Sequence, residues 1–274
     1  MPMTINTNLV SLNAQRNLSA SQSSLATSMQ RLSSGLRVNS AKDDAAGLAI
    51  AERMSAQVRG MNVAIRNAND GISLAQTGEG ALGKVSDMLQ RMRELAVQAA
   101  NATNGAGDRT NLDAEFQQLG AEIGRTLGAT KFNGIAILAG GAGAQAFQVG
   151  ANGGETVTIT TTNMSTNANV TAVTGGALTS AATATTAMNN IDTALNTVNG
   201  ERALYGAAQN RFEVIVSTLQ IASENQAASR ARIVDADFAA ETANLSRAQI
   251  LQQAGSAMVA QANQLPQAVL ALLR

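Results

Sequence analysis

The chain has 274 residues with 19 basic and 19 acidic side chains, no His and no Cys, and its aromatic residues are five Phe and one Tyr. The absence of His and Cys excludes the usual zinc sites, thiol nucleophiles, disulfides and catalytic triads with imidazole as the base. A formal net charge of zero, without a basic cluster between aromatic residues, argues against a nucleic-acid partner. We therefore expect no enzyme, no metal and no cofactor.

The first fifteen residues lack the basic segment and continuous apolar run of a secretory signal. No apolar stretch approaches the ~18 residues that cross a bilayer, so we expect no membrane partner. Pro occurs only at positions 2 and 266, and little else interrupts helix propagation. From these features alone we expect a mostly helical cytoplasmic chain.

The N-terminal part predicts a helix with one narrow apolar seam. Its three-four spacing is carried by Leu18, Leu25, Met29, Leu32 and Leu36. A second helix is predicted to start at Ser40, with Asp43 three residues on. Its seam comprises Met54, Val58, Met61, Ile65, Ala68, Ile72 and Ala75, then Leu82, Val85, Leu89, Met92, Ala96 and Ala99. This long seam predicts coiled-coil packing as far as a turn at residues 104–107, after which a shorter helix returns.

The middle of the chain changes from a helical to an extended period. Short antiparallel strands are predicted at residues 135–138, 147–149 and 155–160, with Gly-rich turns between them. From there to about Thr186 the chain is rich in Thr, Asn, Ala and Gly, so we expect no contribution to a core. Gly141 and Gly143 fit a loose dinucleotide fingerprint, but strand-like rather than helical sequence follows, and we expect no small-molecule substrate.

A helical pattern returns at Met188 and runs nearly to the end of the chain. Its seam comprises Phe212, Ile215, Leu219 and Ala222, then Ala248, Leu251, Gly255, Met258, Ala262, Leu265, Val269 and Leu272. The simplest fold pairs the two ends, which predicts a mainly α, elongated antiparallel coiled-coil rod with a small β-hairpin region in the middle of the chain. We divide it into terminal helices (1–43 and 236–274), a helical rod (44–139 and 187–235) and a short hairpin or irregular segment (140–186).

The terminal helices carry very little charge. Residues 1–36 contain only Arg16 and Arg31, and residues 242–273 contain only Arg247. Paired only with each other, such helices bury too little apolar area to offset an ordering entropy of ~1.5 kcal/mol per residue. We infer that neighbouring copies order them, and we expect the ends to be largely disordered in the monomer.

Four segments resemble the bacterial flagellins over nearly the whole chain: QRLSSGLRVNSAKDDAAGLAIAERM at residues 30–54, LQRMRELAVQAAN at 89–101, FNGIAIL at 132–138, and SRAQILQQAGSAMVAQANQLPQAVLALLR at 246–274. The resemblance implies an extracellular structural subunit, of a short form without large outer domains, that self-assembles into the flagellar filament used for swimming. It implies export through the flagellar type III apparatus without a cleaved signal, and an inner core of terminal helices within an outer core of rod helices. The implied partners are other copies of the chain, an export chaperone, the cap and the hook-filament junction proteins.

The resemblance also implies sites of host recognition. Gln90, Arg91, Leu95 and, on the facing helix, Glu115 match positions that contact neighbouring protofilaments and the vertebrate toll-like receptor for flagellin. Residues 30–51 resemble the peptide sensed by the plant receptor. The C-terminal Leu270, Leu272 and Leu273 resemble the element recognised by cytosolic sensors. Without the resemblance, residues 90–97 would be interpreted as a solvated helix face.

Two other classes of protein remain as alternatives. A hook-to-filament junction protein would resemble flagellin mostly at its N-terminus, whereas here the C-terminal segment matches as well. A helical signalling rod of the chemoreceptor kind would need a membrane span or sensory module.

Small seam residues such as Ala68, Ala75, Ala96 and Gly255 could let packed helices slide during filament supercoiling, or could simply be good helix formers.

Overall fold

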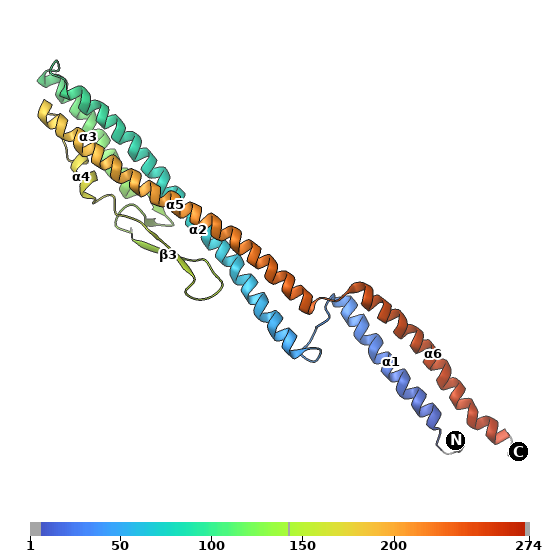
Figure 1. Cartoon of the computed structure of the whole chain (residues 1–274). Helices are drawn as coiled ribbons and strands as arrows, with labels where there is room; N and C mark the ends of the chain where they lie inside the picture. The colour runs from blue at the N-terminus through green and yellow to red at the C-terminus, as the bar shows by residue number, and fades with distance from the viewer. Residues whose placement is uncertain (1–6, 142, 272–274) are drawn as a thin grey trace. The chain divides into compact units, whose positions relative to one another are not determined.

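The computed structural model describes residues 7–141 and 143–271, with side chains up to residue 264. The elements in chain order are α1 (Leu9–Ser34), α2 (Ala45–Ala100), α3 (Ala106–Ala129), β1 (Lys131–Phe132), β2 (Ile135–Ala136), β3 (Ala144–Gln148), β4 (Thr156–Thr160), α4 (Ala168–Thr174), α5 (Ala181–Val234) and α6 (Phe238–Ala271) (Figure 1). The predicted mainly α class with small hairpins is confirmed. Over the described ranges, no helix is both long and apolar enough to cross a membrane.

The chain forms two compact units. The first comprises the chain up to Ala56 and from Asn225 onward, and the second comprises Gln57–Glu224. In the first unit α1 lies antiparallel to α6. Asn8 caps the start of α1 by accepting a hydrogen bond from the Ser11 amide at 3.1 Å. Gly35, at φ +70°, ends α1 in the left-handed conformation that glycine adopts without strain.

The start of α2 differs from the sequence prediction. Ser40 does not begin the helix, because it closes a separate turn in which the Asp43 carboxylate accepts hydrogen bonds from the Ser40 amide (2.9 Å), the Ser40 hydroxyl (3.0 Å) and the Asn39 amide (3.2 Å). The helix begins at Ala45, and the Asp44 carboxylate accepts from the Gly47 amide at 2.8 Å. The Ser40 hydroxyl, followed by the Ser40 amide, lowers the pKa of Asp43.

The second unit is built on the antiparallel packing of α2 against α5. The seam residues of α2 from Leu82 to Ala99 are buried as predicted. Two glycines of α2 receive aromatic rings of α5: a Cβ built on Gly71 would lie 2.8 Å from Cζ of Phe212, and one built on Gly78 would lie 2.8 Å from Cζ of Tyr205. The two glycines are seven residues apart on α2, and the two aromatic residues are seven residues apart on α5. The two contacts are therefore equivalent, two turns apart, and fix the register of the two helices.

Two antiparallel hairpins follow α3. In the first, Asn133 (φ +48°) and Gly134 (φ +82°) form the two-residue turn between β1 and β2. In the second, β3 pairs with β4 from Ala144↔Thr160 to Gln148↔Thr156, so the strand predicted at residues 147–149 starts at Ala144 and ends at Gln148. The second hairpin is held on α2, because the Asn67 side chain donates to the Gln148 carbonyl at 2.9 Å.

The prediction that the segment from residue 161 to about residue 186 contributes nothing to a core is wrong. It contains α4, and its buried apolar residues are Met164, Val170, Val173, Leu178 and Ala184. Side chains of α3 hold its backbone: the Asp113 carboxylate accepts from the Leu178 amide at 2.7 Å, and Gln117 donates to the Gly176 carbonyl at 2.7 Å. A few apolar residues suffice to pack this segment, because α3 supplies both the apolar surface and the hydrogen-bond partners. The following helix, α5, begins at Ala181 and not at Met188 as the sequence predicted.

Candidate assembly surfaces

The contact between α1 and α6 is antiparallel and has a defined register. The Ser11 hydroxyl donates to the Asn263 side chain at 2.7 Å, and the Asn8 side chain donates to the Ala262 carbonyl at 2.7 Å. At the other end Arg31 lies 3.9 Å from Glu241. Between them, Gly255 is packed so closely against Leu18 that an added Cβ would lie 3.2 Å from its Cδ1.

Both helices meet along stripes with three-four spacing that are less apolar than sequence analysis predicted. The α1 stripe is Ser11, Ala14, Leu18, Ser21, Leu25, Ser28 and Leu32, and the α6 stripe is Glu241, Leu245, Ala248, Gln252, Gly255, Val259 and Ala262, all buried or half-buried. The predicted residues Leu18, Leu25, Leu32 and Leu36 are half-buried in this unit. An apolar pattern alone does not identify Glu241 and Gln252, although both fall on the same three-four spacing.

The remaining predicted seam residues lie elsewhere. Met29 is exposed, and so are Leu251 (49%) and Met258 (60%), because the α6 stripe that faces α1 passes through Gln252 and Val259 instead. The expectation that Leu251 and Met258 share one seam with Ala248 is therefore wrong for the contact within the chain. Leu265, Val269, Leu270, Leu272 and Leu273 lie outside the residues whose side chains are described.

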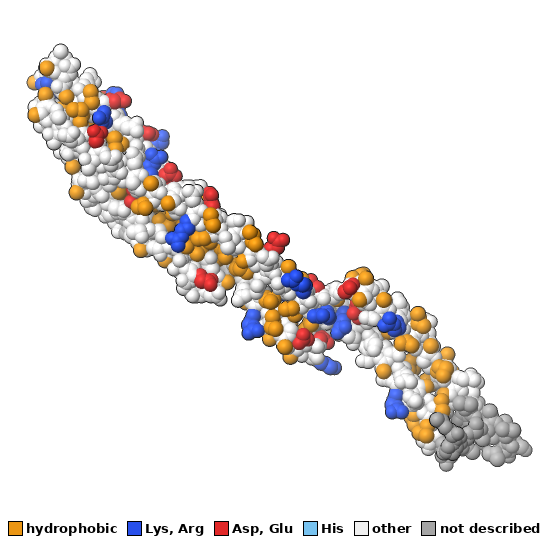
Figure 2. Space-filling model, in the orientation of Figure 1, with side chains coloured by type: hydrophobic (Ala, Val, Ile, Leu, Met, Phe, Trp, Pro, Cys, Tyr) orange, Lys and Arg blue, Asp and Glu red, His pale blue; other side chains and the backbone are white. Residues whose placement is uncertain are grey.

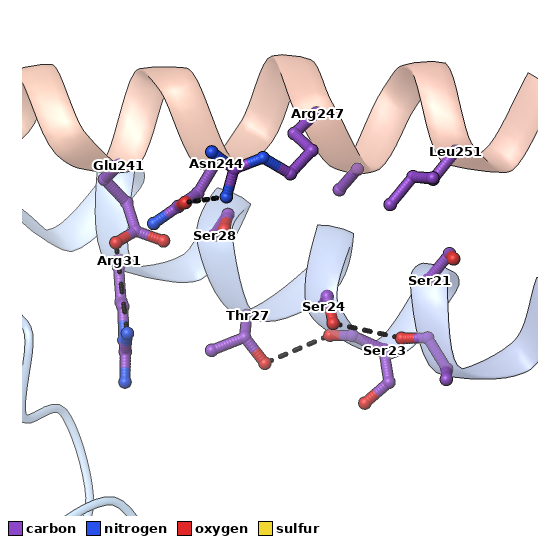
Figure 3. Close-up of a pocket in the computed structure, with 12 residues that line it drawn as sticks. Ser21, Ser23, Ser24, Thr27, Ser28, Arg31, Glu241, Asn244, Arg247 and Leu251 are labelled. Atoms are coloured by element: carbon purple, nitrogen blue, oxygen red, sulfur yellow. Dashed lines mark hydrogen bonds and ion pairs between the residues drawn. The ribbon is translucent and has the colours of Figure 1, made fainter. Parts of the chain in front are cut away.

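A groove of about 490 Å³ runs along one flank of this helix pair. Figure 3 shows the residues that line it, with small hydroxyl side chains on α1 and the Asn244, Arg247 and Leu251 side chains on α6. The lining residues are Ala20, Ser21, Ser23, Ser24, Thr27, Ser28, Arg31, Glu241, Asn244, Arg247, Ala248 and Leu251. We refer to it as the α1/α6 groove.

The charged residues that line the groove are Arg31 and Glu241 at one end and Arg247 in the middle of its α6 wall. The Glu241 side chain is only 10% exposed and its nearest ion-pair partner, at 3.9 Å, is Arg31. Arg247 donates to the Asn244 side chain at 3.2 Å. A buried carboxylate with so long an ion pair stabilises little, because desolvation of the charges opposes the Coulomb attraction.

The outer surface of the pair is asymmetric. Figure 2 shows hydrophobic side chains gathered along α6, whereas the visible surface of α1 is mostly uncharged and polar. The exposed apolar residues of α6 include Ile250 (65%), Leu251 and Met258. Monomeric proteins rarely leave contiguous apolar stripes on a helix exposed, so this face is suited to contact with another molecule.

A second candidate surface lies on α2 and α3 in the other unit. Arg91 donates from Nε to Glu115 at 2.9 Å and from Nη1 to Glu94 at 2.9 Å, which joins α2 to α3. The hydrogen bonds to Glu94 and then Glu115 raise the pKa of Arg91. Gln90, Arg91 and Glu115 are all exposed, as expected of a contact surface.

Leu95 does not lie on this surface. It is 1% exposed and belongs to the core of the unit, so the expectation that it supplies an apolar anchor beside Arg91 is wrong for the folded chain. The exposed apolar residue here is Val97 (50%), which lines a shallow groove with Gln90, Arg93 and Glu94. Position 95 falls on the buried seam that passes through Met92 and Ala99, and this periodicity could have identified it as a core residue.

The chain is similar to known proteins at both ends. Residues 5–142 match the family model for the bacterial flagellin N-terminal helical region, and residues 188–273 match that for the bacterial flagellin C-terminal helical region. A flagellin of Halalkalibacterium halodurans is 48% identical over 272 residues, which covers 99% of this chain and 100% of that protein. Flagellin A of Vibrio anguillarum is 35% identical over 379 positions and is matched along the full length of both chains.

Two solved structures are similar as well. The crystal structure of Bacillus cereus flagellin is 38% identical with a TM-score of 0.51, and the match covers 56% of this chain and 88% of that one. A protein described as flagellar hook-associated, from Vibrio parahaemolyticus, has a TM-score of 0.59 at 15% identity and covers 70% of this chain and 100% of that one. At that identity the second likeness reflects the fold alone.

Proposed function

The chain belongs to the bacterial flagellin family and is a structural subunit of a flagellar filament, and we propose that α1 and α6 are the elements through which its copies assemble. The observation that carries this proposal is the exposed apolar surface of α6 beside the α1/α6 groove. Flagellins of this kind form extracellular filaments and are structural proteins rather than enzymes.

The contact between α1 and α6 supports the proposal because it is weak by itself. Its stripes include Ser11, Ser21, Ser28, Glu241 and Gln252, which contribute little hydrophobic stabilisation when buried. Ordering a residue costs about 1–2 kcal/mol in backbone entropy, which the pair offsets poorly without further burial. Neighbouring copies would supply that burial, and the terminal helices would then become fully ordered only in the filament.

The test is electron microscopy of the purified, heat-dissociated chain after cooling with seed fragments. The intact chain is compared with a chain that lacks residues 242–274. We expect long filaments from the intact chain only. Filaments of equal length and number from both chains would show that α6 is dispensable and would contradict the proposal.

We also propose how the chain is divided in the filament. Residues 1–43 and 236–274 would form its inner core, residues 44–139 and 187–235 its outer core, and residues 140–186 would lie within or just beyond the outer core. The low charge of α1 and α6 supports this layering, since an inner layer is enclosed by protein. Amide exchange of the filament tests it, because inner residues should exchange most slowly.

The proposal extends to how the chain is exported and how a host recognises it. We propose passage of the unfolded chain through the flagellar type III apparatus without a cleaved signal, a chaperone on the C-terminal helix, and addition between the junction and cap proteins. A chain without Cys and with weakly paired ends suits such a route.

We propose that host receptors contact Gln90, Arg91 and Glu115, and that cytosolic sensors recognise Leu270, Leu272 and Leu273. Binding of receptor ectodomain to Arg91→Ala, compared with Lys84→Ala as an exposed control on the same helix, tests the first contact.

A further inference from the structure

The sequence contains four Asn-Gly pairs, at Asn104, Asn133, Asn152 and Asn199. An asparagine before glycine is prone to spontaneous deamidation, in which the backbone nitrogen of the glycine attacks the side-chain carbonyl carbon, because glycine has no side chain to hinder the approach. A glycine N–H that already donates a hydrogen bond reacts slowly, since that bond must first be broken. The backbone surroundings of the four glycines therefore rank the four sites.

Two of the four pairs are protected by hydrogen bonds of the glycine amide. Gly200 lies in the interior of α5, where its amide belongs to the helical hydrogen-bond ladder. Gly105 precedes α3, and its amide donates to the Asp108 carboxylate at 3.0 Å. The negative charge of Asp108 also opposes loss of the proton from that amide. Asn199 and Asn104 should therefore deamidate slowly in the folded chain.

The pair in the first hairpin is held by the strands on either side of it. Asn133 and Gly134 form the whole turn between the paired residues Phe132 and Ile135. Asn133 has φ +48°, in the left-handed region, and ring closure requires a large rotation about its Cα–C bond. The Gly134 amide has no hydrogen-bond partner among the described residues, but the flanking strands oppose this rotation. We therefore expect Asn133 to react more slowly than an asparagine in a longer loop.

Asn152 lies in such a loop, at the tip of the second hairpin between β3 and β4 (Figure 1). Asn152, Gly153 and Gly154 are exposed, and a Cβ on Gly153 would meet nothing within 4 Å. In the part of the chain that the structure describes, the Gly153 amide has no hydrogen-bond partner. Water and hydroxide can therefore reach the nitrogen that has to lose its proton.

The Asn152 side chain is tethered by an exposed carboxylate. Its amide nitrogen donates to Oε1 of Glu155 at 3.0 Å, and the Asn152 backbone nitrogen donates to Oε2 at 3.0 Å. The side-chain bond, followed by the backbone bond, lowers the pKa of Glu155. Water competes for such exposed bonds, so they slow rotation of the Asn152 side chain little.

We propose that Asn152 is a site of spontaneous deamidation, which adds a second carboxylate beside Glu155. The Gly153 nitrogen gives up its proton to water or hydroxide and forms a bond to Cγ of Asn152. The bond from Cγ to Nδ2 breaks, and Nδ2 takes up a proton and leaves as ammonia, so that a cyclic succinimide remains. Water opens this ring at Cγ to leave aspartate, or at the backbone carbonyl carbon to leave isoaspartate with an extra methylene in the main chain. No atom is oxidised or reduced.

The new carboxylate would weaken the contacts of the loop. Ala151 packs so closely on α2 that a Cβ on Gly60 would lie 3.1 Å from its Cα. The loop is closed by the Val149 amide, which donates to the Glu155 carbonyl at 2.9 Å. Loss of the side-chain donor at residue 152 and repulsion between two like charges act against both contacts. We therefore expect a slow, age-dependent loosening of the hairpin tip that does not depend on assembly.

Peptide mapping by mass spectrometry tests the site. The full chain is kept folded in mildly alkaline buffer, and conversion of each of the four asparagines to aspartate or isoaspartate is followed with time. A parallel sample in guanidinium chloride gives the rates without the fold. We expect Asn152 to react several-fold faster than Asn104 and Asn199 in the folded chain and at a similar rate in the denaturant. Conversion of Asn152 in the folded chain that is no faster than theirs, or slower than that of Asn133, would overturn the inference.

Two variants test the role of the glycine amide. Asp108→Ala removes the acceptor of the Gly105 amide and should speed deamidation of Asn104 several-fold, whereas Asp87→Ala, which removes an exposed carboxylate elsewhere, should not. Gly153→Ala fits the open space and should slow deamidation of Asn152 roughly tenfold, because a Cβ hinders the approach of the backbone nitrogen. Unchanged rates in Asp108→Ala and Gly153→Ala would contradict the mechanism.

The structural consequence is measured with variants that need no ageing. Asn152→Asp carries the new charge, and Asn152→Ser is the control that loses the amide without gaining a carboxylate. We expect amide exchange at Val149 to be several-fold faster in Asn152→Asp than in Asn152→Ser, the pKa of Glu155 to be higher, and the first hairpin to be unchanged. Equal exchange at Val149 in the two variants would overturn the proposed loosening by charge.

Discussion

Gly78 of α2 and Tyr205 of α5 fit together so closely that a Cβ on the glycine would lie 2.8 Å from Cζ of the tyrosine ring. The same relationship recurs one heptad away between Gly71 and Phe212, again at 2.8 Å. Phe212 also makes an edge-to-face contact with Phe147, with ring centroids 5.6 Å apart and an interplanar angle of 81°. The register of α2 and α5 thus depends on the two glycines, which leave space for the rings, as well as on the rings themselves.

Gly78→Ala should destabilise the chain even though alanine favours helix more than glycine does. The added methyl group would clash with a fully buried ring, and overpacking of this kind costs about 1–3 kcal/mol. Gly80 and Gly83 are matched controls on the same helix, because a Cβ at either position meets nothing within 4 Å. Alanine there should stabilise by about 0.5–1 kcal/mol. Urea unfolding followed by circular dichroism measures all three, and stabilisation by Gly78→Ala would contradict the register argument.

Tyr205 should resist ionisation in the folded chain. Burial, and secondarily the charge of Glu201, raises its pKa well above the ordinary value. A raised pKa means that the stability linked to this group is present below pH ~10 and is lost as the pH rises through the folded value. Since Tyr205 is the single tyrosine, tyrosinate absorbance reports it alone. We expect little absorbance at pH ~10.5 in the native chain and strong absorbance in urea, and equal titrations would refute the burial.

Tyr205→Phe should leave stability unchanged or raise it by up to about 1 kcal/mol. Within the described part of the chain the Tyr205 hydroxyl is buried without a hydrogen-bond partner, so its removal relieves an unmet polar group. Tyr205→Ala, in contrast, should cost about 3–5 kcal/mol because it leaves a cavity opposite Gly78. Thermal unfolding measures both variants. A large loss in Tyr205→Phe would mean that the hydroxyl has a partner in solution, such as water.

Asp43 should titrate below its ordinary range, because the Ser40 hydroxyl and amide and the Asn39 amide stabilise its charged form. A lowered pKa means that the turn is stabilised above the ordinary carboxyl pKa of ~4 and loses that support as the pH falls through the lower folded value. Ser40→Ala should raise the pKa of Asp43, whereas Ser33→Ala should not. Carboxyl-carbon NMR titration measures both, and an unchanged Asp43 pKa in Ser40→Ala would exclude the hydroxyl as a cause.

Leu95→Ala should destabilise the chain by about 2–5 kcal/mol, since Leu95 is buried in the core. Arg91→Ala should change stability by no more than about 1 kcal/mol, because its ion pairs are exposed. Loss of partner binding in Arg91→Ala would therefore report a contact, whereas in Leu95→Ala it would report unfolding. Unfolding midpoints measured beside binding separate the two cases, and a Leu95→Ala chain of normal stability would contradict this distinction.

Periodicity predicted the buried face of α2 well, because many apolar side chains recur there every three or four residues and can be covered only by another helix. It was only partly right on α6: Ala248, Gly255 and Ala262 lie on the stripe against α1, but that stripe runs through Gln252 and Val259 instead of Leu251 and Met258. Apolar residues at helical spacing indicate that this face of the helix is buried against another element. They do not say whether the same chain or another copy buries it.

The amino-acid sequence by itself determined the helical class, the turn after α2, the hairpin region and the absence of His and Cys chemistry, because each of these follows from local propensity, spacing or composition. Only the tertiary structure decided that α4 is packed on α3 and that α6 leaves Ile250 and Leu251 exposed. These outcomes depend on which elements lie opposite one another. A contact between distant segments is a property of their shapes together, so neither segment carries it alone.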